Sequence, residues 1–287
     1  MSEEVEQESG VLGRAILRLA PRNRAGDRLV ALLRFLRTHR RWPSSAMRLP
    51  DYLFRLKTSD TLLDPLRMLV TDKAWAKLYV RAQVGDSYNV PTLALLDSPE
   101  AVRQVQLPEQ CCVKPTHLSG EVAFHTAESP VDRERLVNWL ERNHYEPTRE
   151  VNHRYLQPRV IVEPILFEDP ELSDYKIFCY RGQPRLIQVD LDRHTRHTRA
   201  LYTPEWEDLG ASMLYPPADR SVPRPENLQE MLDLATALAA PFEFIRVDLY
   251  TDGQHCFVGE LTNCPGSADE PFIPPEAEGP VSDRLFA

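Results

Sequence analysis

Two neighbouring strand-like segments near the C-terminus carry carboxylates that could share a ligand. Alternate residues of a strand lie on one face, so the position of Asp248 in FIRVDLY and of Glu260 in CFVGELT fixes the face of each. If the connecting loop is Gly253–His255, Asp248 lies directly opposite Glu260. A two-residue turn at Asp252-Gly253 would instead place the two acids on opposite faces. The interpretation of this pair therefore depends on the loop.

Opposed carboxylates repel each other unless a cation lies between them. Mg²⁺ is bound by a few carboxylates together with the oxygens of a phosphorylated substrate. Asp248 and Glu260 are therefore candidate magnesium ligands. Arg246, two residues before Asp248 on the same face, is suited to a developing phosphoryl or acyl-phosphate charge. The alternative is a solvent-facing strand surface that happens to carry Arg, Asp and Glu.

Lysine is rare in this chain, because only five of the 34 basic residues are lysines. Each is a candidate for a role that arginine does not fill. Lys114 interrupts an apolar run, where a lysine is costly unless it meets an anion. The small-residue loop that follows it contains Ser119 and Gly120, whose backbone N–H groups could cover phosphate oxygens. Lys176 enters a second apolar strand, and Glu163, between apolar residues and a proline, suits a clamp on an adenosine.

A basic segment follows one of the predicted strands. It contains Arg193, Arg196, His197 and Arg199 within seven residues. One interpretation is a basic loop solvated at the surface. The other is an anion clamp facing either the phosphates of a ligand or an acidic substrate, such as a uronic acid or a glutamate polymer.

The elements that must position these residues alternate between strand pairs and helices. The pattern predicts an α+β fold in two lobes with antiparallel sheets and an N-terminal helical region. Predicted strands span 111–115, 121–126, 159–166, 174–180, 184–190, 244–250 and 256–262, and amphipathic helices span 131–145 and 225–241.

Composition limits the function classes. A net charge of -9 argues against a general basic surface for nucleic acid. Five cysteines without a C-x-x-C pair suggest reduced thiols in a cytoplasmic protein. No run of eighteen apolar residues exists, and the acidic N-terminus is unlike a signal peptide. Residues 11–57 carry twelve basic side chains against two acids. They predict either a surface helix with a solvated basic face or a helix making peripheral contact with an anionic membrane.

The order VKP, small-residue loop, VEPIL, DYK, RVDLY and GELTNCPGS resembles the ATP-grasp ligases, specifically the TupA-like ATP-grasp branch. The resemblance extends over about residues 51–271, and DYKIFCYRGQPRLIQVDLDRHTRHTRALY is its most specific part. It implies a two-lobed ATP-grasp fold that holds ATP between two sheets. The implied domains are an acidic tail with basic helices (1–50), a truncated N-terminal subdomain (51–107), a nucleotide-clamping lobe (108–165) and a catalytic lobe (166–287).

The resemblance also implies roles for single residues. Lys114, Lys176 and, as a weaker candidate, Lys73 or Lys77 would contact the phosphates, with Ser119 and Gly120 covering them and Glu163 meeting the adenosine. Asp248 and Glu260 would bind Mg²⁺, and Arg246, Lys176 and Arg193 would act in catalysis. Arg196, His197 and Arg199 would bind the substrate. The general pattern ends in Glu-x-Asn, whereas here Thr262 lies two residues after Glu260 and Asn263 follows it, so either could complete the metal shell.

The implied activity is an ATP-dependent carboxylate–amine ligase that forms an amide through an acyl phosphate. Its expected cofactors are ATP and Mg²⁺, and its expected partners are an acidic polysaccharide or polymer bearing the carboxylate and an amine acceptor. Two alternatives stay open. One is a kinase that uses the same ATP site on a hydroxyl, and the other is a nucleotide-binding protein without chemistry.

Overall fold

The computed structural model describes residues 19–167, 174–192 and 196–287, so the acidic residues 1–10 and Arg193 lie outside the described residues. Its strands are β1 (Ala94–Leu96), β2 (Cys111–Pro115), β3 (Ala123–His125), β4 (Val160–Glu163), β5 (Asp174–Tyr180), β6 (Gln183–Leu191), β7 (Thr198–Tyr202), β8 (Ser212–Met213), β9 (Phe244–Thr251), β10 (Cys256–Thr262) and β11 (Phe272–Ile273). Its α-helices are α3 (Arg24–His39), α4 (Leu49–Lys57), α5 (Pro65–Thr71), α6 (Lys73–Val84), α7 (Pro99–Gln104), α8 (Arg133–Glu141), α9 (Tyr145–Thr148), α10 (Leu228–Ala239) and α11 (Glu278–Leu285).

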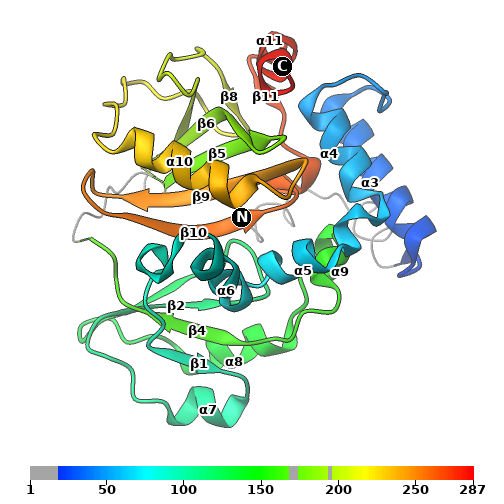
Figure 1. The fold of residues 1–287 in the computed structure, drawn as a ribbon. Coiled ribbons are helices and arrows are strands. Elements are labelled where there is room, and N and C mark those ends of the chain that lie inside the picture. The colour runs from blue at the N-terminus through cyan, green and yellow to red at the C-terminus, as the bar shows by residue number, and fades with distance from the viewer. Residues whose placement is uncertain (1–18, 168–173, 193–195) are drawn as a thin grey trace.

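Two antiparallel sheets, one in each lobe, form the framework (Figure 1). The small lobe holds the order β1-β4-β2-β3, and the large lobe holds β10-β9-β5-β6-β7. Helix α6 lies between the two sheets. The predicted α+β class with antiparallel sheets is confirmed.

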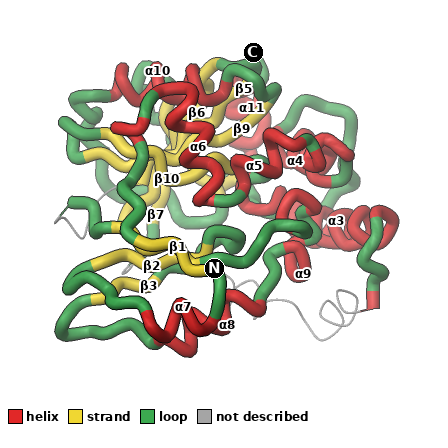
Figure 2. Tube along the Cα trace, turned by 60° about the horizontal axis from the view of Figure 1, so that its bottom comes forward, coloured by secondary structure: helices red, strands yellow, loops and turns green. Residues whose placement is uncertain are grey.

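Helices α7 and α8 lie along one side of the small sheet (Figure 2). Val113 of β2 and Val162 of β4 pack there with Trp139 of α8 in a buried apolar cluster. Successive strand residues point to opposite faces, so the polar side chains of Lys114 and Glu163 leave the sheet on its other face. This alternation turns both side chains toward α6.

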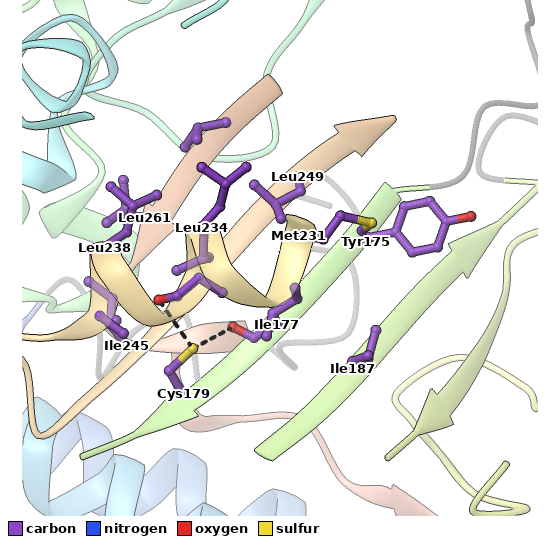
Figure 3. Packing of buried hydrophobic residues seen from close by; sticks show 14 of the residues in the cluster. Tyr175, Ile177, Cys179, Ile187, Met231, Leu234, Leu238, Ile245, Leu249 and Leu261 are labelled. Atoms are coloured by element: carbon purple, nitrogen blue, oxygen red, sulfur yellow. Dashed lines mark hydrogen bonds between the residues drawn. The ribbon is translucent and has the colours of Figure 1, made fainter. Parts of the chain in front are cut away.

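Helix α10 packs on one face of the large sheet and buries its apolar side chains (Figure 3). Ile177 of β5, Ile187 of β6 and Leu249 of β9 contribute to this cluster together with Leu234 of α10. Lys176 and Asp248 are the neighbours of Ile177 on β5 and of Leu249 on β9. They therefore lie on the opposite face. Fully buried apolar residues on both sides of a strand explain why β5 reads as an almost continuous apolar run.

The basic N-terminal helix, α3, is held against the rest of the protein. Arg41, just after it, donates two hydrogen bonds to the buried carboxylate of Asp51, at 2.9 and 2.6 Å. Arg34 donates to the carbonyl of Pro147 at 2.6 Å. Leu29 and Leu33 remain exposed on the outer side. Within the described part of the chain, no helix is both long and apolar enough to cross a membrane.

Candidate functional site

The pairing of Asp248 with Glu260 across β9 and β10 is confirmed, but for a different reason from the expected one. Cys256 pairs with Thr251, so the loop is one residue longer than the expected Gly253–His255. The longer loop alone would move Glu260 out of register with Asp248. A bulge between Val258 and Glu260 shifts the register back.

Gly259 is the bulged residue, and its lack of a side chain is required there. A Cβ atom at this position would lie 2.6 Å from a ring carbon of Tyr250. We expect Gly259→Ala to lower the free energy of unfolding by about 1–3 kcal/mol, the usual cost of overpacking. Urea denaturation measures this. Gly259→Ala combined with Tyr250→Ala should recover part of the loss, and an unchanged midpoint in the single variant would contradict the steric explanation.

Asp248 is buried and already paired with cations of its own sheet. Arg246 donates two hydrogen bonds to its carboxylate, both at 2.7 Å, and the ammonium of Lys176 lies 3.3 Å away. Lys176 also pairs with Asp174 on the same strand and lies 3.7 Å from Asp190. Burial raises the pKa of Asp248, although Arg246 and Lys176 act in the opposite direction. The strands thus gather a compact, buried row of alternating charges.

Glu260 extends this row toward the small lobe. Lys73 lies 3.3 Å from its carboxylate, and Thr262 donates to it at 3.2 Å. Burial favours the neutral acid, but Lys73, Arg246 and Lys176 outweigh burial and lower the pKa of Glu260 to about 2. Glu260 is therefore ionised at neutral pH.

Lys73 joins the two lobes because it begins α6. Asp72 caps this helix by accepting from the backbone of Ala74 at 2.9 Å and Trp75 at 3.1 Å. The same carboxylate accepts from the Thr116 hydroxyl at 2.9 Å, which fixes the helix start to the small lobe. The Lys73 ammonium then donates to the carbonyl of Leu118 at 2.6 Å. Leu118 lies in the loop that follows β2, next to Ser119 and to Gly120, whose φ of 77° is left-handed.

The small lobe contributes a second charged cluster. The buried carboxylate of Glu163 is held between Lys77 and Lys114, with Lys114 at 2.6 Å. The two lysines outweigh burial and lower the pKa of Glu163. Lys77 also donates to the carbonyl of Val90 at 2.6 Å and to the Thr92 hydroxyl at 2.9 Å. Lys77 therefore has more hydrogen-bond partners than Lys114 among the described residues. With two lysines and one glutamate, this cluster carries a net positive charge.

The donor set fits magnesium only in the presence of a phosphate. No three acidic, histidine or cysteine side chains gather around one point in residues 19–167, 174–192 and 196–287. Two opposed carboxylates and the Thr262 hydroxyl would nevertheless supply part of a shell that phosphate oxygens complete. Arg246 and Lys176 now neutralise Asp248, so an incoming phosphate would draw them away from that carboxylate.

The structure does not bring every expected residue to this row. Asn263 donates instead to the carbonyl of Arg67 and the hydroxyl of Thr71, both at 3.1 Å. Its side-chain oxygen accepts from Arg67 at 2.8 Å. Thr262, not Asn263, is therefore the neutral oxygen beside Glu260.

Arg199 does not form the free anion clamp that the basic segment suggested. It is buried and donates to Asp190 at 2.6 Å, to the carbonyl of Met213 at 2.8 Å and to Glu270 at 3.0 Å. The ring of His197 stacks on Tyr215 with centroids 3.6 Å apart. Arg196 is the exposed member, 82% exposed and 3.4 Å from Asp219.

Arg199→Met is expected to act on stability. It leaves the buried carboxylate of Asp190 without its main partner, which costs about 3–5 kcal/mol of unfolding free energy. Arg196→Ala, in the same segment but exposed, should change this free energy by less than about 0.5 kcal/mol. Urea denaturation of both variants makes the comparison, and equal midpoints would contradict the structural role of Arg199.

The sequence interpretation missed three charged residues that the structure places at or beside the site. They are Asp174, Asp190 and Glu270. Asp174 could have been predicted from the sequence, since it lies two residues before Lys176 and so on the same strand face. Glu270 could not have been predicted in this way, because its contact with Arg199 joins distant parts of the chain.

Comparisons with known proteins give one family match and several similar solved structures. The family model for TupA-like ATP-grasp proteins matches residues 53–284. No curated protein sequence matches this chain significantly. Similar solved structures include a D-alanine–D-alanine ligase from Bacillus anthracis complexed with ATP, at 16% identity over 69% of this chain and 55% of that one, with a TM-score of 0.38. An L-amino acid ligase from Bacillus licheniformis is 15% identical over 77% of this chain and 51% of that one, with a TM-score of 0.43. This chain spans about half the length of these two proteins.

Proposed function

We propose that this chain, which belongs to the TupA-like ATP-grasp family, is an ATP-dependent ligase that joins a carboxylate to an amine. One observation carries the proposal. Asp248 and Glu260 are paired across β9 and β10, and Lys73 links Glu260 to the loop that follows β2 in the small lobe. Opposed carboxylates flanked by cations from two lobes are suited to a metal-bound polyphosphate.

Each group would have a defined task in this reaction. Lys114, Lys176 and Lys73 would neutralise the phosphates, with Ser119 and Gly120 beside them, and Glu163 would meet the adenosine. Asp248, Glu260 and Thr262 would hold magnesium, which when bound neutralises the outer phosphates. We propose the same division between lobes, with residues 108–165 clamping the nucleotide and 166–287 carrying the chemistry.

Arg246 is the group best placed to stabilise the transferring phosphoryl group. The substrate carboxylate would attack the γ-phosphorus and ADP would leave, giving an acyl phosphate. The guanidinium of Arg246, once released from Asp248, would hold the charge that develops on the transferring oxygens. Positioning and fixed charge would supply most of the rate enhancement.

The finer proposal is that the carboxylate belongs to an acidic polysaccharide or polymer. Its support is the exposed guanidinium of Arg196, close to the partly exposed ring of His197 in sequence. Arg199 no longer supports it, since Asp190 and Glu270 occupy that side chain.

Trapping with hydroxylamine tests the ligase proposal. The protein would be incubated with Mg²⁺, ATP, hydroxylamine and a panel of sugar acids and amino acids. We expect one of these carboxylates to stimulate ADP release and to yield a hydroxamate, because hydroxylamine attacks acyl phosphates. ADP release without hydroxamate would indicate the kinase alternative, and neither product with any acid would favour a non-catalytic nucleotide-binding protein.

A further inference from the structure

A pair of hydrogen-bond acceptors without a donor lies beside the end of β10. A carboxylate oxygen of Glu150 is 3.8 Å from Nε2 of His153. Both side chains are buried, with 6% and 11% of their surfaces exposed. No N–H or O–H group of the described residues donates to the carboxylate of Glu150 within hydrogen-bond distance. A cation that reached this largely buried carboxylate from solvent would be held more strongly than at a fully exposed one.

The tautomer of His153 shows that Nε2 is a hydrogen-bond acceptor, like the carboxylate of Glu150. Its Nδ1 lies 3.1 Å from the carbonyl oxygen of His117, which can only accept, so Nδ1 carries the proton. In the neutral ring, Nε2 then presents a lone pair toward Glu150. Burial lowers the pKa of His153, although Glu150 acts in the opposite direction, so the neutral ring is favoured at neutral pH. Two acceptors thus face each other across a gap.

This pair is anchored next to the proposed reaction centre. Asn152 donates to the Thr71 hydroxyl at 3.0 Å, and Asn263 donates to the same oxygen at 3.1 Å. The shared hydroxyl fixes the 3₁₀ turn Val151–His153 beside the residue that follows Thr262. The charges of Lys73 and Glu260 also act on the pKa of His153. The gap therefore lies alongside the end of the strand that carries Glu260.

The neighbouring cations are already engaged. The Lys57 ammonium donates to the carbonyl and the hydroxyl of Ser267, both at 2.7 Å. The guanidinium of Arg149 bonds to Asp27 and to the carbonyl of Pro21, both at 3.1 Å. His144, whose ring centroid is 4.4 Å from that of His153, has its pKa lowered well below the ordinary value by burial. A metal ion is disfavoured, because the described residues bring no third ligand to this pair.

We propose that Glu150 and His153 bind the protonated amine of the acceptor, and that His153 takes a proton from it. An ammonium group offers both the positive charge that Glu150 lacks and the N–H donors that both acceptors lack. The assignment of this pair to the second substrate rests on the proposed ligase function. Beyond that function, the inference states where the acceptor amine binds and that it binds in its ammonium form.

The step balances. One proton moves from the ammonium to Nε2 of His153, and the imidazolium is stabilised by Glu150. The freed nitrogen lone pair attacks the acyl carbon, the bond between this carbon and the phosphate oxygen breaks, and the second proton leaves with the phosphate. The products are the amide, hydrogen phosphate and protonated His153.

Binding of methylammonium tests the proposed ammonium site without turnover. Long-range ¹H–¹⁵N spectra report the ring nitrogens of His153, assigned with His153→Gln. We expect methylammonium chloride to shift Nε2 saturably, and tetramethylammonium, which has no N–H donor, to leave it unchanged. Glu150→Gln should weaken methylammonium at least about tenfold, and Glu150→Asp should weaken it less. Glu146→Gln, an exposed carboxylate paired with Arg22 at 2.8 Å, is the matched control and should bind as the wild type does.

Three results would overturn the inference. They are a free protein with both ring nitrogens of His153 protonated at neutral pH, no shift with methylammonium, and equal affinity in wild type and Glu150→Gln. Hydroxylamine, which is neutral at this pH, needs no ammonium site. Glu150→Gln should therefore keep hydroxamate formation while losing at least about tenfold in amide formation with methylamine. Methylammonium binding without any hydroxamate would disprove the ligase function and leave the ammonium site standing.

Discussion

Asp248→Asn should reduce carboxylate-stimulated ADP release by at least about a thousandfold, the scale of losing a central electrostatic group. The neutral amide would not provide an anionic metal ligand, but its oxygen could still accept a hydrogen bond from Arg246, and Lys176 would keep its pairing with Asp174. Stability should change little. Burial raises the pKa of Asp248 in the folded state, so its ionisation opposes folding above the pKa of the unfolded chain, and a neutral side chain removes that cost. We expect the unfolding temperature to move by less than about 5 °C.

A coupled assay for ADP and thermal unfolding by circular dichroism measure both effects. Asp233→Asn is the matched control, since Asp233 is exposed on α10 and accepts only from Gln229 among its described neighbours. It should leave both turnover and unfolding temperature unchanged. Collapse of the fold in Asp248→Asn would mean that this carboxylate is structural, and retained turnover would remove it from the reaction.

Lys114→Met should weaken the binding of Mg²⁺·ATP by about a hundredfold, equivalent to about 2.7 kcal/mol. Lys114 supplies a charge that the nucleotide phosphates would attract, and Glu163 is its ion-pair partner among the described residues. The fold should tolerate the change, because Lys77 remains paired with Glu163 and Met retains most of the apolar stem.

Titration calorimetry measures the dissociation constant of the nucleotide for Lys114→Met. Arg103→Met is the control for loss of a small-lobe cation, since Arg103 is half-exposed and pairs with Glu134 at the surface at 2.9 Å. A dissociation constant within about twofold of the wild type for Lys114→Met would contradict the assigned role.

Local strand geometry made much of the large sheet predictable. Alternation placed Asp248 on the same face as Arg246, and the same rule explains why Lys176 lies opposite the apolar face that packs on α10. The pairing with Glu260 followed from an assumed loop that was one residue too short. A glycine within a strand pattern is typical of a bulge, so Gly259 could have been used to predict the bulge that restores the register.

Long-range contacts set the limits of the prediction. The neighbours of a strand in a sheet are not written in its own sequence, so the pairing of β5 with β9 was beyond local reasoning. The same reason accounts for Arg199, whose acidic partners come from β6 and from the loop after β10. A basic segment looks the same in sequence whether its arginines bind a ligand or buried acids of the same chain.

The most direct test is the binding of ATP in the presence and absence of Mg²⁺, compared between wild type and Glu260→Gln by titration calorimetry. We predict saturable binding by the wild type that tightens with Mg²⁺, and a much smaller metal effect in Glu260→Gln, since half of the opposed carboxylate pair is then neutral. Binding that is indifferent to the metal, or equally strengthened by it in both proteins, would contradict the assignment of this pair as the place where metal and phosphates meet.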